Sequence, residues 1–188
     1  MIIPIVAYGT KVLKQKAEEI SSDYPNLKEL IEDMFETMYE ASGVGLAAPQ
    51  IGRSIRLFIV DGSPFADEDA DMEGFRKVFI NPQIVEESGE EWNFNEGCLS
   101  IPSIREDVSR LSKVRIRYQD ENFKTIEEEY DGTKARIIQH EYDHIEGVLF
   151  TDYLSAIKKR LLKRKLNDIS KGNVKVDYRM KFPLKKGR

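Results

Sequence analysis

The chain has 188 residues, of which 33% are charged and 40% hydrophobic, with a formal net charge of −4 at pH 7. This length suits one domain with a real hydrophobic core, and the composition is ordinary for a soluble globular protein. The single cysteine excludes an internal disulfide and favours a reducing, cytoplasmic location. The apolar run at residues 1–7 is broken by Pro4 and lacks a basic leader, so we expect no signal peptide. No stretch approaches the roughly 20 apolar residues of a membrane span, and we expect no membrane partner.

The first predicted helix follows Asp23 and Pro25 and is stopped by Gly43. Its apolar residues recur at the i, i+3, i+4, i+7 spacing of one buried helix face: Leu27, Leu30, Ile31, Met34, Phe35 and Met38. The residues that follow, 43–52, read GVGLAAPQIG. We expect a loop here, because its glycines permit backbone conformations and close approaches that side chains would block.

Strand patterns occupy the middle of the chain. We predict strands at 55–60, at 77–85 with an edge or bend at Pro82, and at 90–94, followed by a hairpin of 114–119 with 124–130. The acidic segment 65–74 reads as an exposed insertion loop. The pattern predicts an α+β fold, with antiparallel or mixed β-sheets packed around a central helix, and with an N-terminal and a C-terminal helix.

The central helix carries HEYDH at residues 140–144, an instance of HExxH. His140 and His144 lie one helical turn apart on the same face, so both imidazoles can bind one metal ion. Glu141 lies beside them and can reach a metal-bound water without ligating the metal. These are the only two histidines of the chain, and Asp131 or Thr133 can cap the helix. The motif therefore predicts a metal site rather than an accidental pair of histidines.

A catalytic metal of this kind needs a third protein ligand. The stretch HEYDHIEGVLF nearly matches HExxHxxGxxH, but its last position is Phe150, which cannot bind metal. Cys98, within EGCLS at residues 96–100, is the best candidate, and a downstream carboxylate such as Asp168 is the rival. A zincin-type metallopeptidase would use the downstream ligand and leave Cys98 idle. An RNA-binding domain with a structural metal would need a fourth protein ligand and would leave Glu141 without a role.

Three motifs in this order, GVGLAAPQIG, EGCLS and HEYDH, resemble the GxGLAAxQ, EGCLS and HExDH signatures of the peptide deformylases. The resemblance extends from residues 4–17 to the helix after Phe150 and so covers most of the chain. It implies a hydrolase that removes the formyl group from N-formylmethionyl nascent peptides and releases formate. It also implies Fe(2+) as the physiological ion, with Zn, Ni or Co able to substitute, bound by Cys98, His140 and His144.

The resemblance also implies roles for residues around the metal. Glu141 would move a proton from water to the leaving amine, while the Leu99 backbone N–H and the Gln50 side-chain amide would stabilise the oxyanion. An apolar pocket would hold the methionine side chain. The residues expected to line the cleft or its rim are Val44, Gly45, Phe94, Arg105 and Ile137, and Glu96 and Arg110 would pair behind the ligands.

A final helix is predicted at 154–170, ended by Gly172, with an apolar face of Leu154, Ile157, Leu161, Leu162, Leu166 and Ile169. From residue 158 onward the chain has thirteen Lys or Arg against two acids. We expect a single catalytic domain at 1–172, which includes this helix, and a basic tail at 173–188. The resemblance implies ribosome contact through the helix, a solvated helix face is the alternative, and no DNA partner is expected. On this basis the tail takes no part in the chemistry, and truncation after about Gly172 would leave peptide turnover intact.

Overall fold

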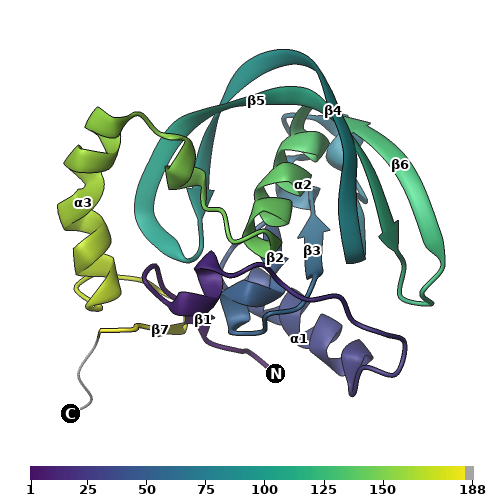
Figure 1. The fold of residues 1–188 in the computed structure, drawn as a ribbon, viewed down its shortest axis with the longest axis horizontal. Coiled ribbons are helices and arrows are strands. Elements are labelled where there is room, and N and C mark those ends of the chain that lie inside the picture. The colour runs from purple at the N-terminus through teal and green to yellow at the C-terminus, as the bar shows by residue number, and fades with distance from the viewer. Residues whose placement is uncertain (185–188) are drawn as a thin grey trace.

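The computed structural model describes residues 1–184 and confirms an α+β fold (Figure 1). Three α-helices, seven β-strands and five short 3-10 helices follow one another along this part of the chain. Their bounds are β1 Ile5–Val6, η1 Lys11–Lys14, α1 Leu27–Glu40, β2 Gly45–Ala47, η2 Ala48–Ile51, β3 Leu57–Asp61, η3 Ser63–Phe65, η4 Ala70–Met72, β4 Arg76–Cys98, β5 Ile101–Gln119, β6 Thr125–Asp131, α2 Gly132–Ile145, η5 Phe150–Tyr153, α3 Ala156–Ser170 and β7 Met180–Lys181.

Five of the strands form one antiparallel sheet in the order β2-β3-β4-β5-β6, and β1 pairs in parallel with β7 in a second, two-stranded sheet. The long strands β4 and β5 arch beside α2, and α3 lies on the outer side of β5 (Figure 1). The predicted hairpin is present as the pairing of β5 with β6, from Lys113 opposite Asp131 to Gln119 opposite Thr125. Chain segments far apart in the sequence therefore surround the helix that carries HEYDH.

The strands predicted at 77–85 and 90–94 are parts of one strand, β4, so their separation was wrong. The ladder between β4 and β5 shifts register between Ile80 and Gln83, around Pro82, and again further along. Proline cannot donate to a ladder, but a bulge at that position lets the strand bend and continue. The segment 65–74 is largely exposed, as expected, but it includes a short helical turn, η4, and buries Met72 completely.

Helix α2 is central because its apolar face is buried in the core. Ala135, Ile137, Ile138 and Ile145 are each no more than 5% exposed and belong to a hydrophobic cluster with residues of β3, β4 and β5. Helix α1 buries the apolar face predicted for it against a neighbouring cluster. Burial of such side chains contributes about 1.5–3 kcal/mol each, so these contacts fix the position of α2 in the fold.

Helix α3 buries a narrower face than the sequence predicted. Leu162, Leu166 and Ile169 pack against the body, but Ile157 and Leu161 are each 74% exposed, and their assignment to the buried face was wrong. Successive helical residues are rotated by about 100°, so Leu161 points away from the stripe that begins at Leu162. The body contacts the helix along that single stripe.

Within residues 1–184, no helix is long and apolar enough to cross a membrane.

In the turn after α2, we expect substitution of Gly147 to be destabilising. Its φ is +74°, and an added Cβ would lie 2.8 Å from the Lys14 carbonyl carbon, whereas Gly74, with φ +69°, has open space around it. Gly74→Ala should cost about 1 kcal/mol of unfolding free energy from left-handed strain alone. Gly147→Ala should cost at least about 2 kcal/mol more, because the backbone of η1 must move. Urea denaturation of both variants measures the difference, and equal costs would mean that an added Cβ at Gly147 meets no obstacle in η1.

Candidate active site

The two histidines of α2 and the cysteine at the end of β4 come together in the fold. The potential ligand atoms of Cys98, His140 and His144 all lie within 4.8 Å of one another, and Cys98 Sγ is 3.4 Å from His144 Nε2. Asp168, the alternative third ligand, is not part of this cluster or of any other found in residues 1–184. The structure therefore supports the cysteine as third ligand and not the zincin arrangement.

The donor set fits a metal ion. His140 donates from Nδ1 to Glu96 Oε1 at 2.8 Å, which leaves Nε2 as the ring nitrogen available for coordination. Burial lowers the pKa of His144 well below its ordinary value and keeps this imidazole in the neutral form that binds metals. Burial also acts to lower the pKa of His140, but its hydrogen bonds with Cys98 and Glu96 outweigh that effect and raise it. One thiol and two imidazoles are the three-ligand set of a catalytic site with an open position.

Glu96 is a buried carboxylate that receives several hydrogen bonds behind the ligands. Arg110 donates to it from Nε at 2.8 Å and from Nη2 at 3.0 Å, which is the pairing expected from the sequence. Arg136 donates from Nη1 at 2.9 Å. Burial acts to raise the pKa of Glu96, but the hydrogen bonds from His140 and Arg110 lower it well below its ordinary value. The group therefore remains charged and holds the ring of His140 in one orientation.

Two residues of this network were missed by the sequence reasoning. Arg136 is 1% exposed, its guanidinium lies 4.7 Å from the ring centroid of Trp92, and Nη1 also donates to the Val108 carbonyl at 2.8 Å. Asp143 accepts from Arg110 Nη1 at 2.7 Å. The available signal for Arg136 was its position one turn before His140 on the same face of an otherwise apolar helix segment.

Glu141 is buried at the cleft beside the ligand cluster, 4% exposed. Burial raises its pKa to about 7, and within residues 1–184 its Oε2 atom has no hydrogen-bond partner. Gly45 provides the room for this carboxyl group, because an added Cβ there would clash with Glu141 Oε1. The arrangement leaves a carboxyl group of near-neutral pKa able to exchange a proton with a bound molecule.

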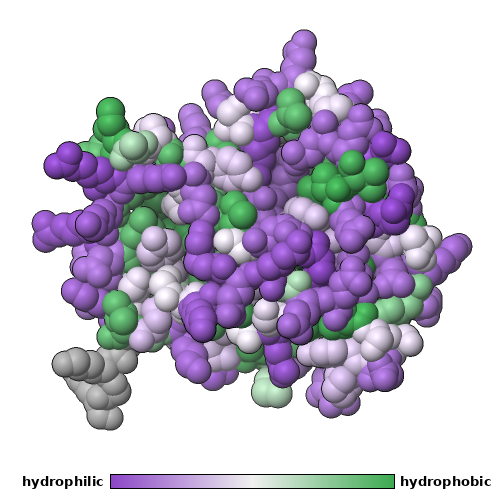
Figure 2. Space-filling view, in the orientation of Figure 1, coloured by the Kyte–Doolittle hydropathy of each residue, from purple (hydrophilic) through white to green (hydrophobic). Residues whose placement is uncertain are grey.

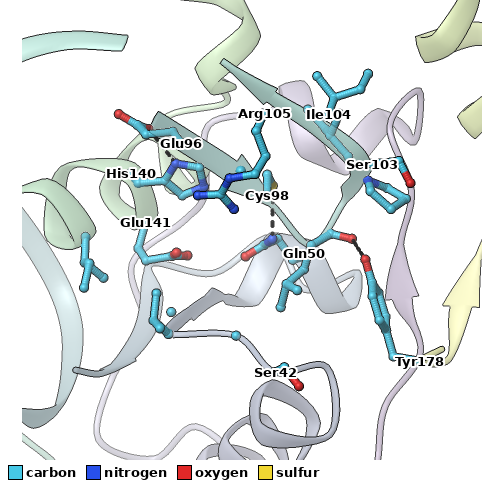
Figure 3. Close-up of a pocket in the computed structure, with 18 of the residues that line it drawn as sticks. Ser42, Gln50, Glu96, Cys98, Ser103, Ile104, Arg105, His140, Glu141 and Tyr178 are labelled. Carbon is cyan, nitrogen blue, oxygen red and sulfur yellow. Dashed lines mark hydrogen bonds and ion pairs between the residues drawn. The ribbon is translucent and has the colours of Figure 1, made fainter. Parts of the chain in front are cut away.

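The side-chain amide of Gln50 is held with its NH₂ group toward the cleft (Figure 3). Its Oε1 accepts a hydrogen bond from the Ala47 N–H at 2.9 Å, which fixes the orientation of the amide. Its Nε2 then lies 3.5 Å from Cys98 Sγ and 3.4 Å from Ser100 Oγ. A donor group in this position can stabilise negative charge that develops beside the ligand cluster.

A cleft of about 500 Å³ opens over these groups. All five residues expected at the cleft or its rim lie in its wall, together with Leu99: Val44, Gly45, Phe94, Arg105 and Ile137. Arg105 is held by Asn95, through Nε to Oδ1 at 2.9 Å and Nη2 to the backbone carbonyl at 2.8 Å. The sequence did not anticipate that residues 175–178, which follow the last helix, also line the cleft. Figure 3 shows Tyr178 there.

Comparison with known proteins agrees with these observations. The sequence model of the polypeptide deformylase family matches residues 2–160. Curated peptide deformylases of Christiangramia forsetii and Flavobacterium johnsoniae are 59% and 57% identical to the chain, and both alignments cover all of both proteins.

Solved structures show the same fold. A peptide deformylase from Legionella pneumophila is 38% identical with a TM-score of 0.80, over 92% of this chain and 98% of that one. A peptide deformylase from Plasmodium falciparum is 36% identical with a TM-score of 0.80, over 89% and 95%. The chain belongs to the polypeptide deformylase family, metal-dependent hydrolases that remove the formyl group from the N-terminal formylmethionine of newly synthesised polypeptides.

Proposed function

We propose that Cys98, His140 and His144 hold the catalytic metal of this deformylase and that Glu141 is its proton-transfer group. One observation carries the proposal. The carboxyl group of Glu141 is buried beside the three candidate ligand side chains, and within the described part of the chain its Oε2 atom has no hydrogen-bond partner. A buried polar atom without a partner is costly, so this oxygen atom points to a role with a bound molecule.

The reaction is hydrolysis of a small, unhindered amide, and the bound metal supplies Lewis acidity and an activated water at neutral pH. Glu141 accepts a proton from the attacking water and delivers it to the nitrogen of the leaving amine. Gln50 Nε2 and the Leu99 backbone N–H donate to the oxygen of the formyl group as negative charge grows on it. Each such donor typically lowers the barrier by about 2.7–4 kcal/mol.

The apolar part of the cleft suits the methionine side chain. Val44, Phe94 and Ile137 come from three different elements or loops and line the same cavity. Methionine is flexible and unbranched, so a pocket of mixed aliphatic and aromatic character accommodates it. Gly45 lines the cleft and, having no side chain, leaves room for the carboxyl group of Glu141, and Arg105 places a positive charge at the rim. Glu96 and Arg110 orient the ligands from behind.

For the metal itself we propose Fe(2+), with Zn, Ni or Co as substitutes. A thiolate with two imidazoles is a borderline-soft donor set that accepts each of these ions. Iron is the choice that the family resemblance implies.

We further propose that the enzyme binds the cytoplasmic ribosome, from which its nascent-chain substrates emerge, through α3. Lys158, Lys159, Arg160, Lys163, Arg164 and Lys165 are all exposed on this helix, and Lys158 also pairs with Glu106 at 2.9 Å. Figure 2 shows hydrophilic side chains that project from the side of the molecule where α3 lies, beside a hydrophobic patch. Nascent chains leave a ribosome whose surface is largely RNA phosphate, which a cationic helix face attracts.

Replacement of Glu141 tests the proton-transfer role. Glu141→Ala should retain metal at the parental stoichiometry, because the three ligands remain, and should lose nearly all formate release from a formyl-methionyl peptide. Metal analysis of the purified variant and a formate assay measure the two properties separately. Comparable turnover in metal-loaded variant and parent would exclude Glu141 as the proton-transfer group.

Exposure to air tests the identity of the metal. Protein loaded with Fe(2+) should lose activity in air, because a ferrous ion with a thiolate ligand and an open position is susceptible to oxygen. Protein loaded with nickel or zinc should persist longer under the same conditions. The measurement is formate release over time after aerobic dilution of enzyme purified without oxygen. Equal durability of all three forms would contradict the expected lability of the iron enzyme.

Charge reversal on α3 tests the ribosome contact. A triple variant with Lys159, Lys163 and Arg164 changed to Glu should lose salt-sensitive co-sedimentation with ribosomes, while turnover of a free formyl-peptide stays near parental. The control reverses three exposed cations elsewhere, Lys28, Arg53 and Lys124, with the same change in net charge. Unchanged co-sedimentation of the first variant would mean that the cations of α3 form only a solvated face.

A further inference from the structure

The segment that follows α3 returns to the cleft instead of leaving the body. β7 pairs in parallel with β1, through Ile5 N–H to the Arg179 carbonyl at 2.9 Å and Ala7 N–H to the Lys181 carbonyl at 2.9 Å (Figure 1). The residues just before this strand, 175–178, line the cleft. Tyr178 is therefore placed at the active site by a strand pairing between the two ends of the chain.

Tyr178 holds the turn between β4 and β5. Its hydroxyl donates to the Leu99 carbonyl at 2.7 Å, and the bond is drawn at the right of Figure 3. The next carbonyl of the same turn, that of Ser100, accepts from the Tyr8 N–H at 2.8 Å. Gln50 Nε2 lies 3.4 Å from the Ser100 hydroxyl. Groups from the N-terminal segment, from η2 and from the C-terminal segment thus converge on two residues.

This convergence matters because Leu99 directly follows the ligand Cys98. The N–H and the carbonyl of one residue are separated by only two soft dihedral angles, so fixing the carbonyl restricts the direction of the N–H. A residue in a short turn has few ladder bonds of its own, and side-chain hydrogen bonds then decide its orientation. A donor to a developing oxyanion is effective when it is already aimed before the reaction.

We infer that Tyr178 is a positioning residue for deformylation, whose hydroxyl holds the Leu99 turn so that its backbone N–H faces the formyl oxygen. The inference rests on the role proposed above for Leu99. It extends the catalytic unit beyond residue 172, into the part of the chain expected from the sequence to be a tail. It also reverses the expectation that truncation after about Gly172 leaves peptide turnover intact.

The test removes only the hydroxyl. Tyr178→Phe keeps the ring, which is partly buried and packs against the core, and loses the bond to Leu99. The matched control is Tyr39→Phe, which loses a hydroxyl bond of similar length, 2.6 Å to Asp61 Oδ2, outside the cleft lining. Metal-loaded parent and variants are compared by steady-state turnover of a formyl-methionyl peptide. Hydrogen exchange of the peptide that spans residues 98–101 reports the order of the turn independently of activity.

We expect Tyr178→Phe to lower kcat by about two- to tenfold with KM within about twofold of parent, and to speed exchange at 98–101. Tyr39→Phe should change neither. Parental kcat and parental exchange in Tyr178→Phe would overturn the inference. Faster exchange with parental kcat would also overturn it, because the turn would then be held by Tyr178 without consequence for the reaction. A parent that releases no formate would instead refute the proposed function, while the exchange comparison would still report on Tyr178.

Discussion

The buried carboxylate of Glu96 is the group on which the site depends. It lies near the end of β4 and accepts hydrogen bonds from Arg110 of β5 and from Arg136 and His140 of α2. A buried charge is tolerated only when it is paired and hydrogen-bonded. Removal of Glu96 or of one of these donors would therefore leave buried polar or charged groups without a partner. Because they belong to three elements, the same bonds that neutralise the carboxylate also fix the helix of the histidines relative to the strand of Cys98.

The site next to this network leaves polar groups unsatisfied. Within the described chain, Glu141 Oε2 and His144 Nδ1 are buried without hydrogen-bond partners. Each such group opposes folding by about 1–3 kcal/mol. The cost is offset by the packing of α2 in the core, where its apolar face is almost completely buried. The buried apolar face thus stabilises α2, while the other face of the helix carries the polar site residues.

The two ends of the chain complete the cleft. The N-terminal segment and the C-terminal segment pair as β1 and β7, and each supplies a donor to the turn that follows Cys98. This closure uses contacts between residues far apart in the sequence: Ile5 pairs with Met180, Ser170 donates to the Tyr8 carbonyl 162 positions away, and Tyr178 donates to the Leu99 carbonyl 79 positions away. The active site is therefore assembled from the whole described chain and not from its three motifs alone.

The sequence by itself determined the chemistry and most of the elements. HEYDH places two imidazoles one turn apart whatever the surroundings, and the regular apolar spacing of α1 and α2 and the alternation around residues 114–130 depend only on local geometry. Tertiary structure decided the rest. The continuity of β4 past Pro82, the exposure of Leu161, the burial of Arg136 and the place of Tyr178 in the cleft all depend on which distant surfaces meet. No local pattern encodes such contacts, because burial and pairing are properties of two segments at once.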